Sequence, residues 1–80
     1  MIVTVLYYDE VAKGYGGMEY TYRTELPLIP YQKVLAPTPK GDKKAIVRQI
    51  NLPETAIHPD WAEKVKYISL LDTGERHEKN

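Results

Sequence analysis

The chain has 80 residues, the size of one small domain, and it contains no cysteine. It therefore has no disulfides and no thiolate nucleophile or ligand, a composition typical of a reducing, cytoplasmic setting. No apolar run reaches the ~18 residues of a membrane-spanning helix, so we expect no membrane partner. Lysine plus arginine balances aspartate plus glutamate at 11 each. This balance argues against strong non-specific DNA binding, whose affinity comes from neutralised phosphates, and equally against an acidic mimic of DNA.

The first part of the chain predicts two strands separated by a glycine-rich loop. Residues 2–8 are apolar on both faces, which indicates a central strand or a barrel strand. Residues 9–17 fit neither period and predict a mobile loop; they lack the residues of a phosphate-binding loop. Residues 18–23 alternate in polarity, and the alternation favours core positions for Tyr20 and Tyr22.

The middle of the chain predicts a connection and a hairpin. Residues 26–30 contain two prolines, which cannot donate hydrogen bonds, so they predict an extended connection. Residues 31–36 and 44–52 predict the third and fourth strands. The turn residues at 40–43 join these strands into a hairpin.

The last part predicts a short helix, a strand and a tail. Residues 58–64 predict a helix of about two turns, because Pro59 suits a first helical position. Residues 65–71 predict a last strand, and the polar residues 73–80 predict a frayed tail. About five strands with short connections favour a mainly β fold, a small antiparallel β-barrel or half-barrel with one short helix, in a single domain at 1–72.

Residues that carry catalysis or bind metals are sparse. The sequence holds two histidines, His58 and His77, and one serine, Ser69, and their spacing predicts neither a zinc site nor a nucleophile–base pair. We therefore expect no enzyme, no catalytic residue, no metal and no cofactor.

Basic residues gather on the predicted hairpin, at Lys40, Lys43, Lys44 and Arg48. Basic side chains beside aromatic ones suit single-stranded nucleic acid, because phosphates pair with the former and bases stack on the latter. Tyr20 would supply such an aromatic ring. The alternative, which the pattern favours, is a solvated turn with the tyrosines in the core.

Four short motifs follow one another along the chain. Tyr20-Thr21-Tyr22 follows the first strand, and Lys33-Val34-Leu35-Ala36-Pro37 follows an extended segment. Ala45-Ile46-Val47-Arg48-Gln49-Ile50 follows a turn, and Val65-Lys66-Tyr67-Ile68-Ser69-Leu70-Leu71-Asp72 closes the pattern. Their order resembles the amino-terminal DNA-binding domain of PriA, the primosomal replication-restart helicase family. The resemblance covers most of residues 2–72, and stand-alone small proteins carried by phages and prophages look similar.

The resemblance implies a small β-barrel that holds the 3′ end of a DNA strand at a fork. The family's pocket uses an aspartate, a glycine and a lysine; here Thr21 and Pro39 stand at the first two positions and Lys66 matches the third. Thr21 lacks the carboxylate that would accept a hydrogen bond from a terminal hydroxyl, and Pro39 lacks an amide donor. The 80 residues contain no helicase motor, so the resemblance implies no ATP hydrolysis.

Three hypotheses for function remain open. The first is a non-catalytic module that binds DNA ends, single-stranded DNA or forked DNA in replication, with binding residues Tyr20, Thr21, Lys40, Lys43, Lys44, Arg48 and Lys66. The second is a phage- or prophage-encoded module that docks on a host replication or defence protein, which the neutral charge and the seven tyrosines favour. The third is a structural subunit of a homo-oligomer, and the sequence leaves the oligomeric state open.

Overall fold

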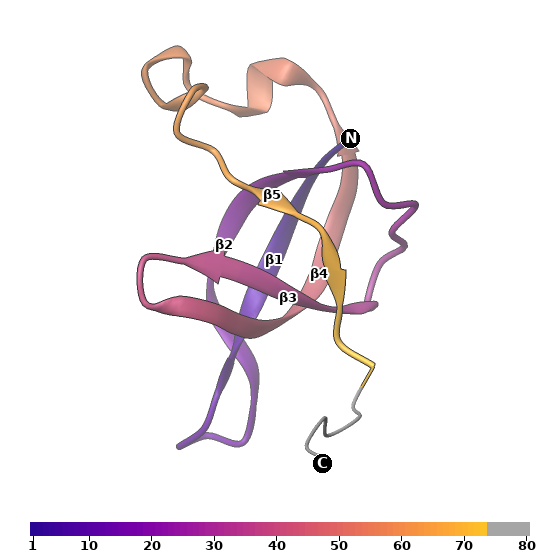
Figure 1. The fold of residues 1–80 in the computed structure, drawn as a ribbon, viewed down its shortest axis with the longest axis vertical. Coiled ribbons are helices and arrows are strands. Elements are labelled where there is room, and N and C mark those ends of the chain that lie inside the picture. Colours follow the sequence, from indigo (N-terminus) through magenta and orange to yellow (C-terminus); the bar gives the residue numbers. More distant parts are fainter. Residues whose placement is uncertain (74–80) are drawn as a thin grey trace.

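The computed structural model describes residues 1–73, and its strands form one curled sheet (Figure 1). The six strands are ordered β5-β2-β1-β4-β3-β6. Their bounds are β1 (Ile2–Asp9), β2 (Gly14–Thr24), β3 (Lys33–Thr38), β4 (Gly41–Leu52), β5 (Tyr67–Ile68) and β6 (Leu70–Leu71). The mainly β, half-barrel-like fold is confirmed. The described sheet stays open, with β5 and β6 at its edges, and has one strand more than expected.

Strand β1 is central, as its two apolar faces predicted. It pairs antiparallel with β2 on one side and β4 on the other, so its backbone groups are satisfied in both directions. Val3 and Val5 are fully buried in the core, and Ile2 and Thr4 on the other face are also buried. Burial of both faces explains why this strand reads as a continuous apolar run.

The predicted mobile loop at residues 9–17 is wrong for most of its length. The ladder between β1 and β2 continues until Asp9 faces Gly14. The turn between them is held by the Asp9 carboxylate, which accepts a hydrogen bond from the Val11 amide at 2.8 Å. Lys13 adopts a left-handed φ of 59° to complete the turn. The glycines concealed this strand because they have no side chain with which to show a period of two.

The predicted hairpin of β3 and β4 is confirmed, with a tighter turn than expected. Thr38 faces Gly41 across the hairpin, so the turn consists of residues 39–40 instead of 40–43. Gly41 has a φ of 108°, which favours glycine. The Thr38 hydroxyl donates to the Gly41 carbonyl at 2.6 Å and closes the turn.

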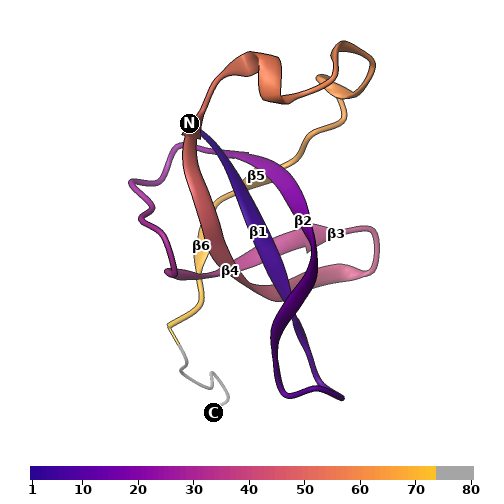
Figure 2. The ribbon, with the colours of Figure 1, turned by 180° about the vertical axis from the view of Figure 1, so that it is seen from behind.

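The predicted last strand, residues 65–71, is divided into two short strands. Strand β5 pairs parallel with β2, and β6 pairs antiparallel with β3, with Ser69 between them. The expectation of a wholly antiparallel sheet is therefore wrong at one pairing. The segment crosses the open side of the curled sheet and meets a different edge at each end, as Figures 1 and 2 show from opposite sides.

The predicted helix at residues 58–64 is replaced by two short 3₁₀ turns, η1 (Glu54–Ala56) and η2 (Pro59–Trp61). Pro59 does begin the second turn, where the His58 Nδ1 accepts a hydrogen bond from the Asp60 amide at 3.1 Å. The first turn of an α-helix is unfavourable, and this cost is offset only when further residues extend the helix. Here each 3₁₀ turn ends after three residues. Among residues 1–73 no helix is long and apolar enough to cross a bilayer. The predicted tail lies outside the described residues except for Thr73.

One buried threonine fastens the last segment to the sheet. Thr24, at the end of β2, is only 1% exposed. Its hydroxyl donates to the Ile68 carbonyl at 2.8 Å and accepts a hydrogen bond from the Leu26 amide at 3.0 Å. Ile68 is itself buried among the core valines, so this threonine holds in place a side chain on which the core depends.

We predict that Thr24→Val destabilises the protein by about 2 kcal/mol, because it leaves the buried Ile68 carbonyl and the partly buried Leu26 amide without their partner. Chemical denaturation followed by tryptophan fluorescence measures the change. The control is Thr55→Val at an exposed position, which we expect to change stability by less than about 0.5 kcal/mol. Equal losses in the two variants would contradict the role given to Thr24.

A carboxylate links three neighbouring strands on the outer side of the sheet. Glu19 on β2 accepts hydrogen bonds from the Thr4 hydroxyl of β1 at 2.7 Å and from the Gln49 amide of β4 at 2.9 Å. The hydrogen bond from Thr4, followed by that from Gln49, lowers the pKa of Glu19. Ionised Glu19 therefore stabilises the folded state.

We predict that Glu19→Gln lowers stability at neutral pH and that its difference from the wild type shrinks in acid. Because the folded-state pKa is lowered, the contribution is complete above the unfolded pKa and is lost as pH falls through the folded value. Denaturation midpoints measured from neutral to acid pH test this. Glu10→Gln, at the exposed hairpin tip, is the control, and a pH-independent difference for Glu19→Gln would rule out the mechanism.

Candidate functional site

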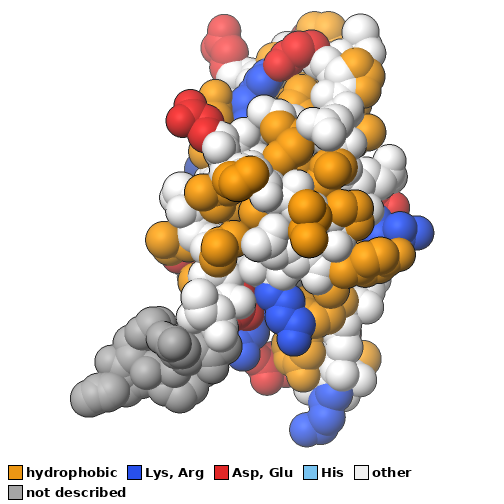
Figure 3. All heavy atoms as spheres, turned by 90° about the vertical axis from the view of Figure 1, so that its right-hand side faces the viewer, with side chains coloured by type: hydrophobic (Ala, Val, Ile, Leu, Met, Phe, Trp, Pro, Cys, Tyr) orange, Lys and Arg blue, Asp and Glu red, His pale blue; other side chains and the backbone are white. Residues whose placement is uncertain are grey.

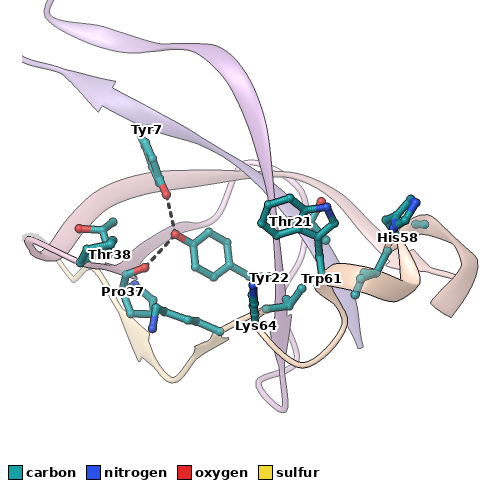
Figure 4. A pocket seen from close by; sticks show the side chains of 13 residues that line it. Tyr7, Thr21, Tyr22, Pro37, Thr38, His58, Trp61 and Lys64 are labelled. Carbon is teal, nitrogen blue, oxygen red and sulfur yellow. Dashed lines mark hydrogen bonds between the residues drawn. The ribbon is translucent and has the colours of Figure 1, made fainter.

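A cleft of about 380 Å³ lies between the sheet and the excursion that joins β4 to β5. The sheet supplies its floor through Tyr7, Thr21 and Tyr22 and one wall through the hairpin residues 37–39. The excursion supplies the opposite wall, which contains Ile57, His58, Trp61, Lys64 and Lys66. We call it the Trp61 cleft, and Figure 4 shows the side chains that line it.

The floor is held by a chain of two tyrosine hydroxyls. Tyr22 is 5% exposed, and its hydroxyl donates to the Pro37 carbonyl at 2.9 Å. The Tyr7 hydroxyl lies 2.5 Å from that of Tyr22. Each hydroxyl has one hydrogen and a carbonyl only accepts, so Tyr7 donates to Tyr22 and Tyr22 to Pro37 (Figure 4). Burial, followed by the hydrogen bond with Tyr7, raises the pKa of Tyr22.

The excursion wall is anchored to β2 at two points. Arg23 and Glu54 form a two-pronged ion pair with distances of 2.6 and 3.0 Å, which ties η1 to the strand. The Arg23 amide also donates to the Lys66 carbonyl at 3.0 Å. Both ends of the excursion are therefore fixed to β2.

The outer part of this wall combines an aromatic ring with a cation. Trp61 is 59% exposed, and the Lys64 ammonium lies 5.4 Å from its ring centroid. The Lys64 amide also donates to the Trp61 carbonyl at 2.8 Å, which keeps the two residues together. The wall thus presents a partly free aromatic face beside a positive charge.

The electrostatic character of the cleft is one-sided. Lys64 and Lys66 are its charged residues, His58 is its titratable imidazole, and no aspartate or glutamate is among its lining residues. The lining of the cleft therefore carries positive charge, although Glu54, Asp60 and Glu63 lie on the same excursion and the Asp60 Oδ2 is 3.7 Å from the His58 Nδ1. Such local concentration attracts anions even where the whole protein is neutral.

The structure brings together three sequence positions that the PriA resemblance singled out. Thr21 on β2, Pro39 in the hairpin turn and Lys66 before β5 all line the Trp61 cleft. They are far apart in the sequence, and the curl of the sheet places them around one hollow. Of the residues expected to bind DNA, Thr21 and Lys66 are the two that lie in it.

Tyr20 and Lys43 line a second hollow of about 450 Å³ at the hairpin of β1 and β2. The Tyr20 ring stacks on that of Tyr7 at 4.4 Å, and the Lys43 ammonium lies 5.6 Å from the Tyr7 centroid. Tyr20 is 39% exposed, so its predicted core position is wrong, while that of Tyr22 is confirmed. The hairpin of β1 and β2 extends beyond the core at this point, so alternation no longer separates buried from exposed faces (Figure 1).

The remaining basic residues that were expected to bind DNA do not line the cleft. Lys44 stands over the ring of Tyr8 at 6.0 Å, and Lys40 is exposed in the turn next to Pro39. Arg48 is exposed on β4, where its charge contributes to the lowered pKa of Glu19.

The sequence did not single out three residues that line the cleft: the aromatic residues Tyr7 and Trp61 and the basic residue Lys64. The single tryptophan of the chain, three residues before a lysine, was the available signal.

Among residues 1–73, no three histidine, aspartate or glutamate side chains gather closely enough to hold a metal ion. No family model, no curated protein and no solved structure matches the chain. The chemistry of the Trp61 cleft is therefore the basis for assigning a function.

We predict that Tyr22→Phe destabilises the protein by about 1–3 kcal/mol, because the Pro37 carbonyl loses its donor and the Tyr7 hydroxyl its acceptor. Urea denaturation gives the change in free energy. Tyr31→Phe, which removes the hydroxyl of an exposed tyrosine, is the matched control. Indistinguishable midpoints for the two variants would show that the hydroxyl chain contributes nothing to the floor of the cleft.

Proposed function

We propose that the chain is a non-catalytic module that binds single-stranded DNA, with the end of the strand in the Trp61 cleft. One observation carries this proposal: an exposed aromatic ring and two lysines line a hollow that contains no carboxylate. Stacking of a base on an aromatic side chain contributes about 1–3 kcal/mol, whatever the base. Lysines add the phosphate contacts that such binding needs.

The size of the cleft favours a terminal nucleotide. Its volume of about 380 Å³ is near the lower end of the range for small-molecule sites, and it suits one nucleotide better than several. Tyr7 lines both this cleft and the second hollow, where Tyr20 and Lys43 lie. A strand whose last nucleotide occupies the cleft would find a further aromatic ring and a further lysine on the side of that hollow next to Tyr7, while Asp9 and Glu10 also line it.

The resemblance to the PriA amino-terminal domain supports the same proposal. The three positions that correspond to the end-binding pocket of that family, Thr21, Pro39 and Lys66, line the Trp61 cleft. In this proposal the chain acts at strand ends or forks during replication. The helicase family's ATP-dependent activity forms no part of it.

A second candidate function has an observation of its own. Exposed apolar side chains gather on the side of the molecule shown in Figure 3, where the connection between β2 and β3 runs. Ile29 and Tyr31 in that connection and Leu70 and Leu71 on the edge strand β6 are exposed. Exposed apolar patches and unpaired strand edges are typical protein contacts. This face favours docking on a protein, such as a host replication or defence protein if the chain is phage-encoded.

We predict that labelled single-stranded and forked DNA bind the protein at low salt and that the affinity falls at moderate salt. Trp61→Ala should weaken binding about tenfold or more through lost stacking. Lys64→Gln and Lys66→Gln should each lower the slope of log affinity against log salt by roughly 0.7, the value for one phosphate contact on a single strand. Fluorescence anisotropy titrations measure all three effects.

The matched control is Lys33→Gln, which removes one positive charge from an exposed site outside the cleft. We expect it to change affinity far less than the cleft variants. Absence of binding at tens of micromolar DNA would refute the proposal and favour the protein-docking function. Equal effects of Lys33→Gln and Lys66→Gln would place the DNA elsewhere on the surface.

A further inference from the structure

The hydrogen-bonding groups on the sheet side of the cleft are largely occupied. The Tyr7 hydroxyl donates its hydrogen to the Tyr22 hydroxyl, and the Tyr22 hydroxyl donates its hydrogen to the Pro37 carbonyl. The Thr38 hydroxyl donates to the Gly41 carbonyl and accepts from the Lys40 amide. The two prolines of this wall have no N–H to offer. Selectivity for a ligand must therefore come from the remaining groups of the cleft.

Those remaining groups are dominated by strong donors. Lys64 and Lys66 each carry an ammonium with three hydrogens, and Trp61 carries an indole N–H that only donates. Thr21 adds a hydroxyl that can donate or accept. His58 also lines the cleft, but its Nδ1 already accepts from the Asp60 amide, and the Asp60 carboxylate lies 3.7 Å from that atom, outside the lining. Since the lining itself contains no carboxylate, a ligand hydroxyl finds no carboxylate acceptor there, while an anionic oxygen finds several donors.

We infer that the Trp61 cleft selects a strand end that carries a terminal phosphomonoester over one that ends in a free hydroxyl. The base lies against Trp61, and Lys64 and Lys66 pair with the phosphate. This inference rests on the proposed function and names the chemical group that the cleft recognises.

A terminal phosphate differs from an internal one in charge and in acceptors. It carries about −1.5 to −2 charges at neutral pH and three strong acceptor oxygens, whereas a diester within the strand carries a single charge. Two lysines in the lining of one small cleft would match the terminal group better, because its several charged oxygens can accept from more than one ammonium group. A free nucleoside monophosphate shares this chemistry, so a test must separate it from a strand end.

The test compares strands of one sequence that end in a 3′ hydroxyl, a 3′ phosphate or a 5′ phosphate, each labelled at the opposite end. A hydroxyl-ended strand one nucleotide longer controls for the number of phosphate groups. We expect one of the phosphate-ended strands to bind about tenfold more tightly than both hydroxyl-ended strands, as charge-assisted hydrogen bonds require. Unlabelled nucleoside monophosphate should compete at least tenfold more weakly than that strand, as expected if neighbouring nucleotides also bind.

The variants locate the preference. The double variant Lys64→Gln/Lys66→Gln should bind phosphate-ended and hydroxyl-ended strands equally, and Lys33→Gln should keep the wild-type ratio. A preference that survives in the double variant would overturn the assignment to these lysines. Equal competition by the free nucleotide would overturn the assignment to a strand end.

The outcome also separates this inference from the proposed function. Binding of all strands with equal affinity would overturn the inference and leave the single-strand module standing. Absence of binding by every strand would overturn both. A ratio near ten that the double variant abolishes would support both.

Discussion

The fold depends on one short segment that pairs with both edges of the sheet. Residues 67–71 bond to β2 at one end and to β3 at the other, and Ile68 in their middle is buried in the core. A domain of 80 residues buries a limited apolar area, so an uncovered side of the curled sheet would expose its core valines to water. The segment covers that side without a closed barrel. Thr24 fixes the position of this segment, because its hydroxyl donates to the Ile68 carbonyl and accepts from the Leu26 amide in the connection that follows β2.

The position of the cleft follows from the same constraint. Because β5 must reach the edge of β2, the chain between β4 and β5 travels across the end of the sheet, seen at the top of Figure 1. Arg23 and its partner Glu54 fix the start of that excursion, and the backbone bond to Lys66 fixes its end. Trp61 and its neighbouring lysine are therefore held opposite the tyrosine floor. A protein with no excess of basic residues can therefore have a hollow whose charged lining residues, Lys64 and Lys66, are both basic.

The two candidate functions use different surfaces of this small domain. The Trp61 cleft lies between the excursion and the sheet. The exposed residues Ile29 and Tyr31 lie in the connection between β2 and β3, and Leu71 lies on the edge strand β6, so none of them lines the cleft. DNA bound at the first surface, as proposed, would leave the second surface accessible. A module with both surfaces could bring a strand end to a protein partner, and this arrangement needs no catalytic group of its own.

Local patterns in the sequence determined the mainly β class, the central strand at residues 2–8 and the hairpin with its turn near Gly41, because burial and turn chemistry act over a few residues. The sequence did not predict that β2 begins at Gly14, because a glycine-rich strand shows no alternation and is identified only by its pairing with β1. The division of the last strand, and its parallel pairing, depended on which sheet edges the curled backbone brought near it. The candidate site shows the same division. The order of motifs singled out Lys66 as a candidate, but only the tertiary structure placed Lys66 and Trp61 in the lining of one cleft. Contacts between residues distant in the chain depend on topology, and no local spacing records it.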